Sequence, residues 1–191
     1  MGCGPKQAGK LHPSFKPAEW HELRLDINPA VEPDIVASMT NLSSIPSASF
    51  DAVWSSHNLE HLEAHEVPLA LQEFRRVLNG AGFLLITLPD LQRVAELVAQ
   101  DKLLETAYLS PAGPISPIDM IFGFRKAIAA GNHFMAHRTG FTARSLGQAI
   151  VDAGFAVARI KRDDHFNLWG TAYVTRPVEL SPSQAAAAPS A

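Results

Sequence analysis

The chain alternates short apolar runs with stretches whose apolar residues recur every three or four positions, and this alternation constrains its fold most. Strands are predicted at Glu22–Asp26, Asp34–Ser38, Phe50–Ser55, Phe83–Leu88, Phe155–Lys161 and Leu168–Val174. Helices are predicted at Val67–Leu78, Leu91–Val98, about 118–130 and from Thr142 to Gly154. This order predicts an α/β fold with a Rossmann-like, doubly wound and mostly parallel sheet that closes on a C-terminal antiparallel strand.

At 191 residues, one domain is expected, here residues 1–176. Residues 91–139, rich in proline near their middle, form a predicted substrate-side insert within that domain. Residues 177–191 change abruptly to Ala, Ser and Pro, offer little to bury, and are predicted to be a disordered tail.

Charge and cysteine content exclude several classes of function. The net charge is −3 and no basic run occurs, so neither nucleic acid nor an anionic membrane is expected as a partner. The one cysteine, Cys3, rules out a disulfide framework and suits a reducing compartment. No secretory signal or membrane-spanning run of about 18–20 apolar residues is visible. A soluble, cytoplasmic globular protein is therefore expected, with its oligomeric state open.

Three groups of residues stand where ligands bind in such sheets, at the carboxyl ends of strands. Gly2-Cys3-Gly4 opens the chain, and two glycines one residue apart let the backbone approach a charged ligand. Asp26 ends the next predicted strand, where a carboxylate can accept both hydroxyl protons of a ribose. The segment Ser55–His61 follows the strand FDAVW. This series favours a nucleotide-type cofactor.

The tracts MGCGP, LDINP, SFDAVWSSHNLEHL and EFRRVLNGAG resemble the class I S-adenosylmethionine-dependent methyltransferases of the "methyltransferase domain 11" kind. The resemblance covers residues 1–90 by motif and 141–175 more loosely. It implies S-adenosylmethionine as the cofactor and transfer of its methyl group to an unidentified acceptor, either a small-molecule substrate or a group on a larger molecule. The implied cofactor-binding residues are Gly2, Cys3 and Gly4 around the methionine part, Asp26 on the ribose, Ile27, Met39 and Thr40 around the adenine, and Ser56 near the methionine.

The sequence departs from this family in three places. The adenine loop reads SMTN and lacks the acidic residue that many relatives carry there. Pro13 and Pro17 make a poor helix between Pro5 and Trp20, where relatives usually have one. The glycine motif begins at residue 2, which leaves no residues for the strand that precedes it in the family. We therefore expect this central strand to be missing, through an upstream extension of the true protein or a truncated, weakly active form.

A methyl acceptor with a hydroxyl or amine needs a general base, for which histidine is the usual residue at neutral pH. The candidates are His57, His137 and His133. The pattern HNLEH at 57–61 also matches the H-x-x-E-H motif of zinc hydrolases, but it abuts a strand instead of lying within a long helix. No metal is expected, and His61 is interpreted as structural.

The alternatives are a non-catalytic S-adenosylmethionine-binding scaffold and a zinc hydrolase. The interpretation as a nicotinamide-binding domain is less favoured, because the third glycine of G-x-G-x-x-G is absent.

Overall fold

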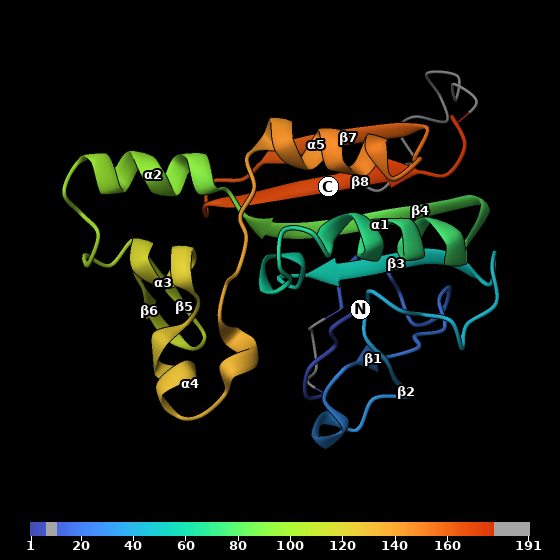
Figure 1. Cartoon of the computed structure of the whole chain (residues 1–191), viewed down its shortest axis with the longest axis horizontal. Coiled ribbons are helices and arrows are strands. Elements are labelled where there is room, and N and C mark those ends of the chain that lie inside the picture. Colours follow the sequence, from blue (N-terminus) through green and yellow to red (C-terminus); the bar gives the residue numbers. More distant parts are fainter. Residues whose placement is uncertain (7–10, 178–191) are drawn as a thin grey trace.

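The computed structural model describes residues 1–6 and 11–177, and a four-stranded sheet forms its centre (Figure 1). The strands are β3 (Phe50–Ser56), β4 (Leu78–Pro89), β8 (Asn167–Tyr173) and β7 (Val157–Arg162), in that spatial order. β3 and β4 pair in parallel, while β8 pairs antiparallel with both β4 and β7. Three strands thus share one direction and only β8 is reversed, which confirms the predicted α/β sheet with its C-terminal antiparallel strand.

Two helices, α1 (Val67–Val77) and α5 (Ala143–Asp152), cover one face of this sheet. Their inward residues, which include Leu71, Phe74 and Ile150, are fully buried against sheet residues such as Leu84. The helix α5 begins where predicted, because the Thr142 hydroxyl accepts a hydrogen bond from the Ser145 amide and caps it.

Aromatic side chains cover the other face of the sheet. The described residues that precede α1 in the chain form no α-helix there. Since neighbouring residues of a strand point to opposite faces, Trp54 lies opposite the buried Val53. Phe15 stacks on Phe83 with ring centroids 6.0 Å apart, and Trp20 meets both rings edge-on. The prolines that predict a poor helix in this region therefore leave an irregular segment that aromatic contacts hold in place.

A separate pair of short parallel strands, β1 (Leu25–Asp26) and β2 (Ile35–Val36), flanks β3 with the short 3-10 helix η1 (Pro29–Val31) between them. Among the described residues no strand lies between β1 and β3. The N-terminal residues connect the two sheets instead. The Met1 amino group donates to the Trp54 carbonyl oxygen at 2.7 Å, and the Cys3 amide donates to the Leu25 carbonyl oxygen at 2.9 Å.

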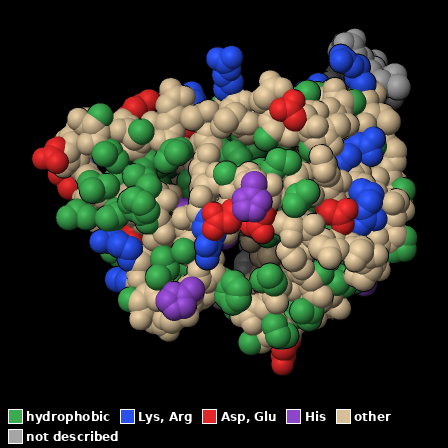
Figure 2. Space-filling model, viewed as in Figure 1, with side chains coloured by type: hydrophobic (Ala, Val, Ile, Leu, Met, Phe, Trp, Pro, Cys, Tyr) green, Lys and Arg blue, Asp and Glu red, His purple; other side chains and the backbone are tan. Residues whose placement is uncertain are grey.

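Residues 91–139, called the insert below, extend from the carboxyl edge of the sheet (Figure 1). Their elements are α2 (Leu91–Ala99), β5 (Tyr108–Ser110), β6 (Gly113–Ile115), α3 (Pro117–Phe122), α4 (Arg125–Ala129) and the 3-10 helix η3 (His133–Met135). Figure 2 shows hydrophobic side chains gathered over the insert, with histidine and acidic side chains at its boundary with the sheet.

Three predictions about these elements were wrong. The single helix predicted at about 118–130 breaks at Gly123, whose φ of 95° favours glycine and where a Cβ would collide with the Met135 carbonyl oxygen. The proline-rich crossing contains the β5–β6 hairpin. The strand predicted from Phe83 begins earlier, at Leu78, because residues 78–82 continue into β4 and pair with β3 across a register shift between Phe50 and Ala52.

The predicted disordered tail at 177–191 lies, except for Pro177, outside the described residues. No helix in the described part of the chain combines the length and the apolar character needed to cross a membrane.

Candidate functional site

The glycine turn at residues 2–4 requires glycine for both conformational and steric reasons. Gly2 and Gly4 have φ values of 59° and 57°, in the left-handed region that favours glycine. The Asn58 side chain donates to the Met1 carbonyl oxygen at 2.7 Å and to the Ser56 carbonyl oxygen at 2.9 Å. A Cβ on Gly2 would overlap the Asn58 amide. The turn is therefore packed against the carboxyl end of β3.

Asp26, at the end of β1, holds the other side of this turn. Its Oδ2 accepts from the Gly4 amide at 2.7 Å and its Oδ1 accepts from the Asn28 amide at 2.9 Å. Arg24 donates to the Gly4 carbonyl oxygen at 2.7 Å. Each carboxylate oxygen keeps a second lone pair, so Asp26 can still accept hydrogen bonds from the two hydroxyls of a ribose.

A cavity of about 320 Å³ lies between β1 and β3, beneath the glycine turn. Of the predicted cofactor residues, Gly2, Cys3 and Ser56 line it. Ile27 is 53% exposed on the outer surface, and Met39 packs against the main core. The Thr40 hydroxyl lies 2.7 Å from the Ser38 hydroxyl. The structure thus brings the glycine turn together with Asp26 and Ser56. No described contact joins the turn to the predicted adenine residues.

His57 lies where β3 ends and the chain turns sharply. Its φ of 52° is unusual for a residue with a side chain, and its amide donates to the Thr87 carbonyl oxygen at 2.8 Å. The side chain is 43% exposed, and its Nδ1 lies 3.3 Å from Oε1 of Glu60. This ring therefore faces solvent on one side and a carboxylate on the other.

Glu60, in the 3-10 helix η2 (Leu59–His61), carries a carboxylate that is 1% exposed. Neither of its oxygens has a hydrogen-bond partner, because the His57 contact is close but not aligned as a hydrogen bond. Burial opposes ionisation of this group. The neighbouring imidazoles, His57 above all, outweigh burial and hold the pKa of Glu60 below its usual value.

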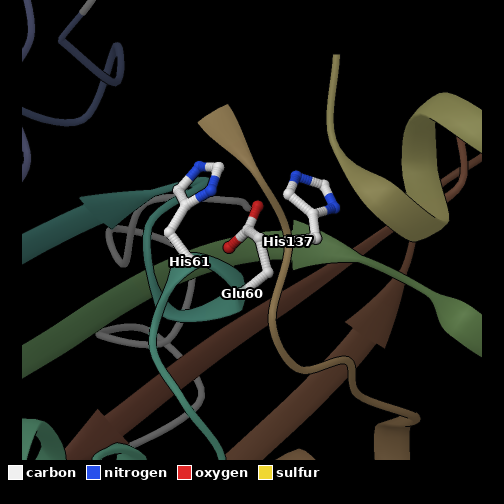
Figure 3. A group of neighbouring side chains, drawn as sticks. All are labelled: Glu60, His61 and His137. Carbon is white, nitrogen blue, oxygen red and sulfur yellow. The ribbon is translucent and has the colours of Figure 1, made fainter. Parts of the chain in front are cut away.

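The rings of His61 and His137 flank Glu60, with centroids 4.9 Å apart (Figure 3). The His61 Nδ1 lies 3.0 Å from the Ala136 carbonyl oxygen, and the His137 Nδ1 lies 2.8 Å from the Met120 carbonyl oxygen. A carbonyl oxygen only accepts, so each Nδ1 carries the proton and each Nε2 keeps a lone pair. Burial lowers the pKa of His137, which favours its neutral form at pH 7.

Backbone hydrogen bonds bring His137 to Glu60 from the far end of the insert. The Arg138 and Thr139 amides donate to the Glu60 carbonyl oxygen at 2.8 and 3.2 Å. One ligand atom each from Glu60, His61 and His137 lies within 4.8 Å of the others. This group of three residues is called the Glu-His-His cluster below.

The structure brings together two of the three predicted bases. His57 and His137 both lie at the Glu-His-His cluster. His133 is exposed on η3, and no hydrogen bond or ion pair of the described residues joins it to the cluster. Sequence reasoning missed Glu60 and His61 as site residues. The H-x-x-E-H pattern did signal them, but it pairs His57 with His61, whereas the structure pairs His61 with His137.

The hydrolase interpretation of HNLEH lacks its required geometry. That motif places both histidines on one α-helix. Here His57 has a left-handed backbone conformation at a strand end, and His61 lies in a 3-10 helix. The two rings therefore do not share a helix face.

Comparison with solved structures shows the same fold. A protein of Thermotoga maritima, described as an S-adenosylmethionine-dependent methyltransferase and possible histamine N-methyltransferase, is 13% identical with a TM-score of 0.50, over 79% of this chain and 72% of that one. A methyltransferase of Haloferax volcanii, solved with the Trm112 methyltransferase activator, is 14% identical with a TM-score of 0.50, over 82% and 72%.

A third structure, of a possible exported protein from Bordetella parapertussis, is 14% identical with a TM-score of 0.49, and this chain spans 51% of its length. No curated protein matches the sequence.

The sheet order and the glycine turn beside an acidic strand end define a Rossmann-like protein that binds a nucleotide-type cofactor. Residues 2–86 match the model of the methyltransferase domain family. The cofactor of this domain is S-adenosylmethionine. The residues present fit it at Asp26, because each oxygen of this carboxylate accepts one amide and keeps a lone pair for a ribose hydroxyl.

Proposed function

We propose that the chain transfers the methyl group of S-adenosylmethionine to an acceptor that is a small molecule or a group on a larger molecule. The observation that carries this proposal is the hydrogen bond between the Gly4 amide and Asp26, beside Ser56 and the cavity, in a chain whose residues 2–86 match the methyltransferase domain family. The cofactor supplies a methyl group already activated on a sulfonium. The chain must therefore position the acceptor and exclude water.

On the cofactor side, we assign the methionine part to Gly2, Cys3, Gly4 and Ser56, the ribose to Asp26, and the adenine to Ile27, Met39 and Thr40. The support for Asp26 is the strongest, because its carboxylate is fixed by two amides and half its lone pairs stay unused. The adenine assignment rests on the family resemblance.

On the acceptor side, His57 fits the role of general base best among the three predicted histidines. Its ring is partly exposed and lies beside a buried carboxylate, which can stabilise the protonated form after proton transfer. A second cavity, of about 220 Å³, lies at the boundary of the insert and includes Glu60, Met120 and His137 in its lining. This volume supports a small acceptor or a side-chain-sized group.

The test is calorimetric titration with S-adenosylhomocysteine, the product that retains the ribose. The Asp26→Ala variant should bind about tenfold to a hundredfold more weakly, because hydrogen bonds to a charged group contribute about 1.5–3 kcal/mol. Asp164→Ala, an exposed carboxylate with no described contact, is the matched control and should bind as the wild type does.

Wild-type protein that does not bind S-adenosylhomocysteine would overturn the proposal. Unchanged affinity in Asp26→Ala would remove this residue from the site. Binding without methyl transfer to any member of a metabolite panel would favour the non-catalytic scaffold.

A further inference from the structure

We infer that Glu60, His61 and His137 form a binding site for one divalent first-row transition-metal cation of the Zn²⁺ type. This inference stands on the Glu-His-His cluster and goes beyond the proposed methyl transfer. Figure 3 shows the carboxylate lying between the two imidazole rings, one from η2 and one from the end of the insert.

The donor set decides which class of cation the site fits. Two imidazole nitrogens and one carboxylate oxygen suit Zn²⁺, Fe²⁺, Co²⁺ and Ni²⁺, whereas Mg²⁺ and Ca²⁺ prefer oxygen donors alone. A thiolate is not part of the cluster, so the site does not resemble a structural zinc centre of the cysteine type.

The surroundings of the histidines match what metal ligands need. A ligating histidine usually donates its other ring N–H to a carbonyl or carboxylate, which fixes the tautomer and orients the ring. Both His61 and His137 have this arrangement, through Ala136 and Met120. Each Nε2 lone pair is thereby left for a cation.

The Glu60 carboxylate supplies the second, independent observation. It is 1% exposed, and neither oxygen has a hydrogen-bond partner. Burial of an ionised carboxylate is costly unless it is paired and hydrogen-bonded or binds a metal. The only neighbouring charged or titratable groups at this carboxylate in the described part of the chain are His57, His61 and His137. A cation in the cluster would satisfy the carboxylate directly.

The distances are compatible with a cation after small side-chain movements. Ligand atoms that hold Zn²⁺ at about 2.0–2.1 Å in tetrahedral geometry lie about 3.4 Å apart. The three ligand atoms lie within 4.8 Å of one another, so rotations that bring them together by about an ångström suffice. Three protein ligands leave a position open, beside the 220 Å³ cavity. An acceptor hydroxyl bound there would have its pKa lowered.

The experiment uses the untagged full chain, dialysed against a chelator and titrated with Zn²⁺ in a calorimeter. Wild-type protein should bind one Zn²⁺ per chain. Co²⁺ in place of Zn²⁺ should give visible absorption bands typical of nitrogen and oxygen ligands. His61→Gln, His137→Gln and Glu60→Gln should each weaken Zn²⁺ binding by more than about tenfold and remove the Co²⁺ bands.

The matched control is His133→Gln, an exposed histidine four positions before His137, which should leave Zn²⁺ affinity unchanged. Circular dichroism checks that each variant folds. The His61 and His137 rings are partly exposed, so their replacement disturbs the core less than replacement of Glu60 does. If Glu60→Gln does not fold, the site is tested by His61→Gln, His137→Gln and the wild-type Co²⁺ spectrum.

Absence of Zn²⁺ binding by wild-type protein, or equal Zn²⁺ affinity in wild type, His61→Gln and His137→Gln, would overturn the site. S-adenosylhomocysteine titration of the same preparation separates this failure from failure of the proposed function. Cofactor binding without Zn²⁺ binding rejects only the cation site, and Zn²⁺ binding without cofactor binding rejects only the methyltransferase proposal.

Discussion

The helix-covered face of the sheet and its carboxyl edge, both built partly from β3 and β4, differ in nearly every physical respect. On the face, Phe74, Leu84 and Leu146 are fully buried among other apolar side chains. At the edge, Glu60 is equally buried yet has no hydrogen-bond partner, the Thr87 hydroxyl also lacks one, and His57 has a left-handed backbone conformation.

Residues on the face therefore stabilise the fold, whereas residues at the edge lower its stability. Unpartnered polar groups and unusual backbone angles lower stability, and they persist where a ligand or a reaction uses them. Changes on the face should therefore lower stability, and changes at the edge should weaken ligand binding or turnover without lowering stability.

The largest effect is expected at the edge. His57→Gln should lower turnover by roughly 10²–10⁴-fold, since loss of a general base has this magnitude. The free energy of unfolding and the affinity for S-adenosylhomocysteine should stay close to wild type. The assay is initial-rate methyl transfer to an acceptor found in a metabolite screen, with the exposed His65→Gln as the control. A fall in cofactor affinity instead of turnover would assign His57 to the cofactor pocket.

On the face, Phe74→Ala should lower the free energy of unfolding by about 3–5 kcal/mol, because it leaves a cavity in a fully buried cluster. Urea denaturation measures this change. In conditions where the variant is still folded, its affinity for S-adenosylhomocysteine should match that of wild type. A loss of affinity in the folded variant would break the separation between face and edge.

A smaller effect is expected from the second buried carboxylate, Asp119, whose hydrogen bonding differs from that of Glu60. Asp119 accepts hydrogen bonds from Ser116 and Arg125, whereas the oxygens of Glu60 accept no hydrogen bond. Burial opposes ionisation of Asp119, but these hydrogen bonds outweigh it and lower its pKa to about 2, from 3.8. The stabilisation is therefore complete above pH about 4 and is lost as the pH falls towards 2.

Asp119→Asn should lower the free energy of unfolding by about 1–2 kcal/mol at neutral pH, a value reduced by the exposure of Arg125. The difference in this free energy between the variant and wild type should close near pH 2. Urea unfolding between pH 2 and pH 7 measures it. A gap that is independent of pH would contradict the assignment to the ionised carboxylate.

Most of the sheet could be predicted from the sequence, because apolar runs and capping residues act locally. Phe50–Ser55 and Phe83–Leu88 both lie within observed strands, and Thr142 caps the helix predicted after it. The break at Gly123 was not predicted, since the need for a residue without a Cβ there comes from the Met135 carbonyl oxygen, which the local pattern does not reveal.

The candidate site could be predicted only where its residues are close in sequence or match a family motif. Asp26 and the glycine turn meet this condition. The pairing of His61 with His137 does not, because it depends on how the insert returns to the sheet. The pattern at 57–61 contains Glu60 and His61, but it pairs His61 with His57, whereas in the structure the His61 ring lies beside that of His137.

The hydrogen bond between His61 and the Ala136 carbonyl oxygen joins residues 75 positions apart, whereas Gly4 and Asp26 are 22 apart. Closing the longer loop costs more chain entropy. The contact between His61 and the end of the insert therefore depends more on the continuity of the chain than the contact between Gly4 and Asp26 does. A chain cut within the insert keeps the connection that places Gly4 beside Asp26, but it loses the covalent link that returns His137 to Glu60.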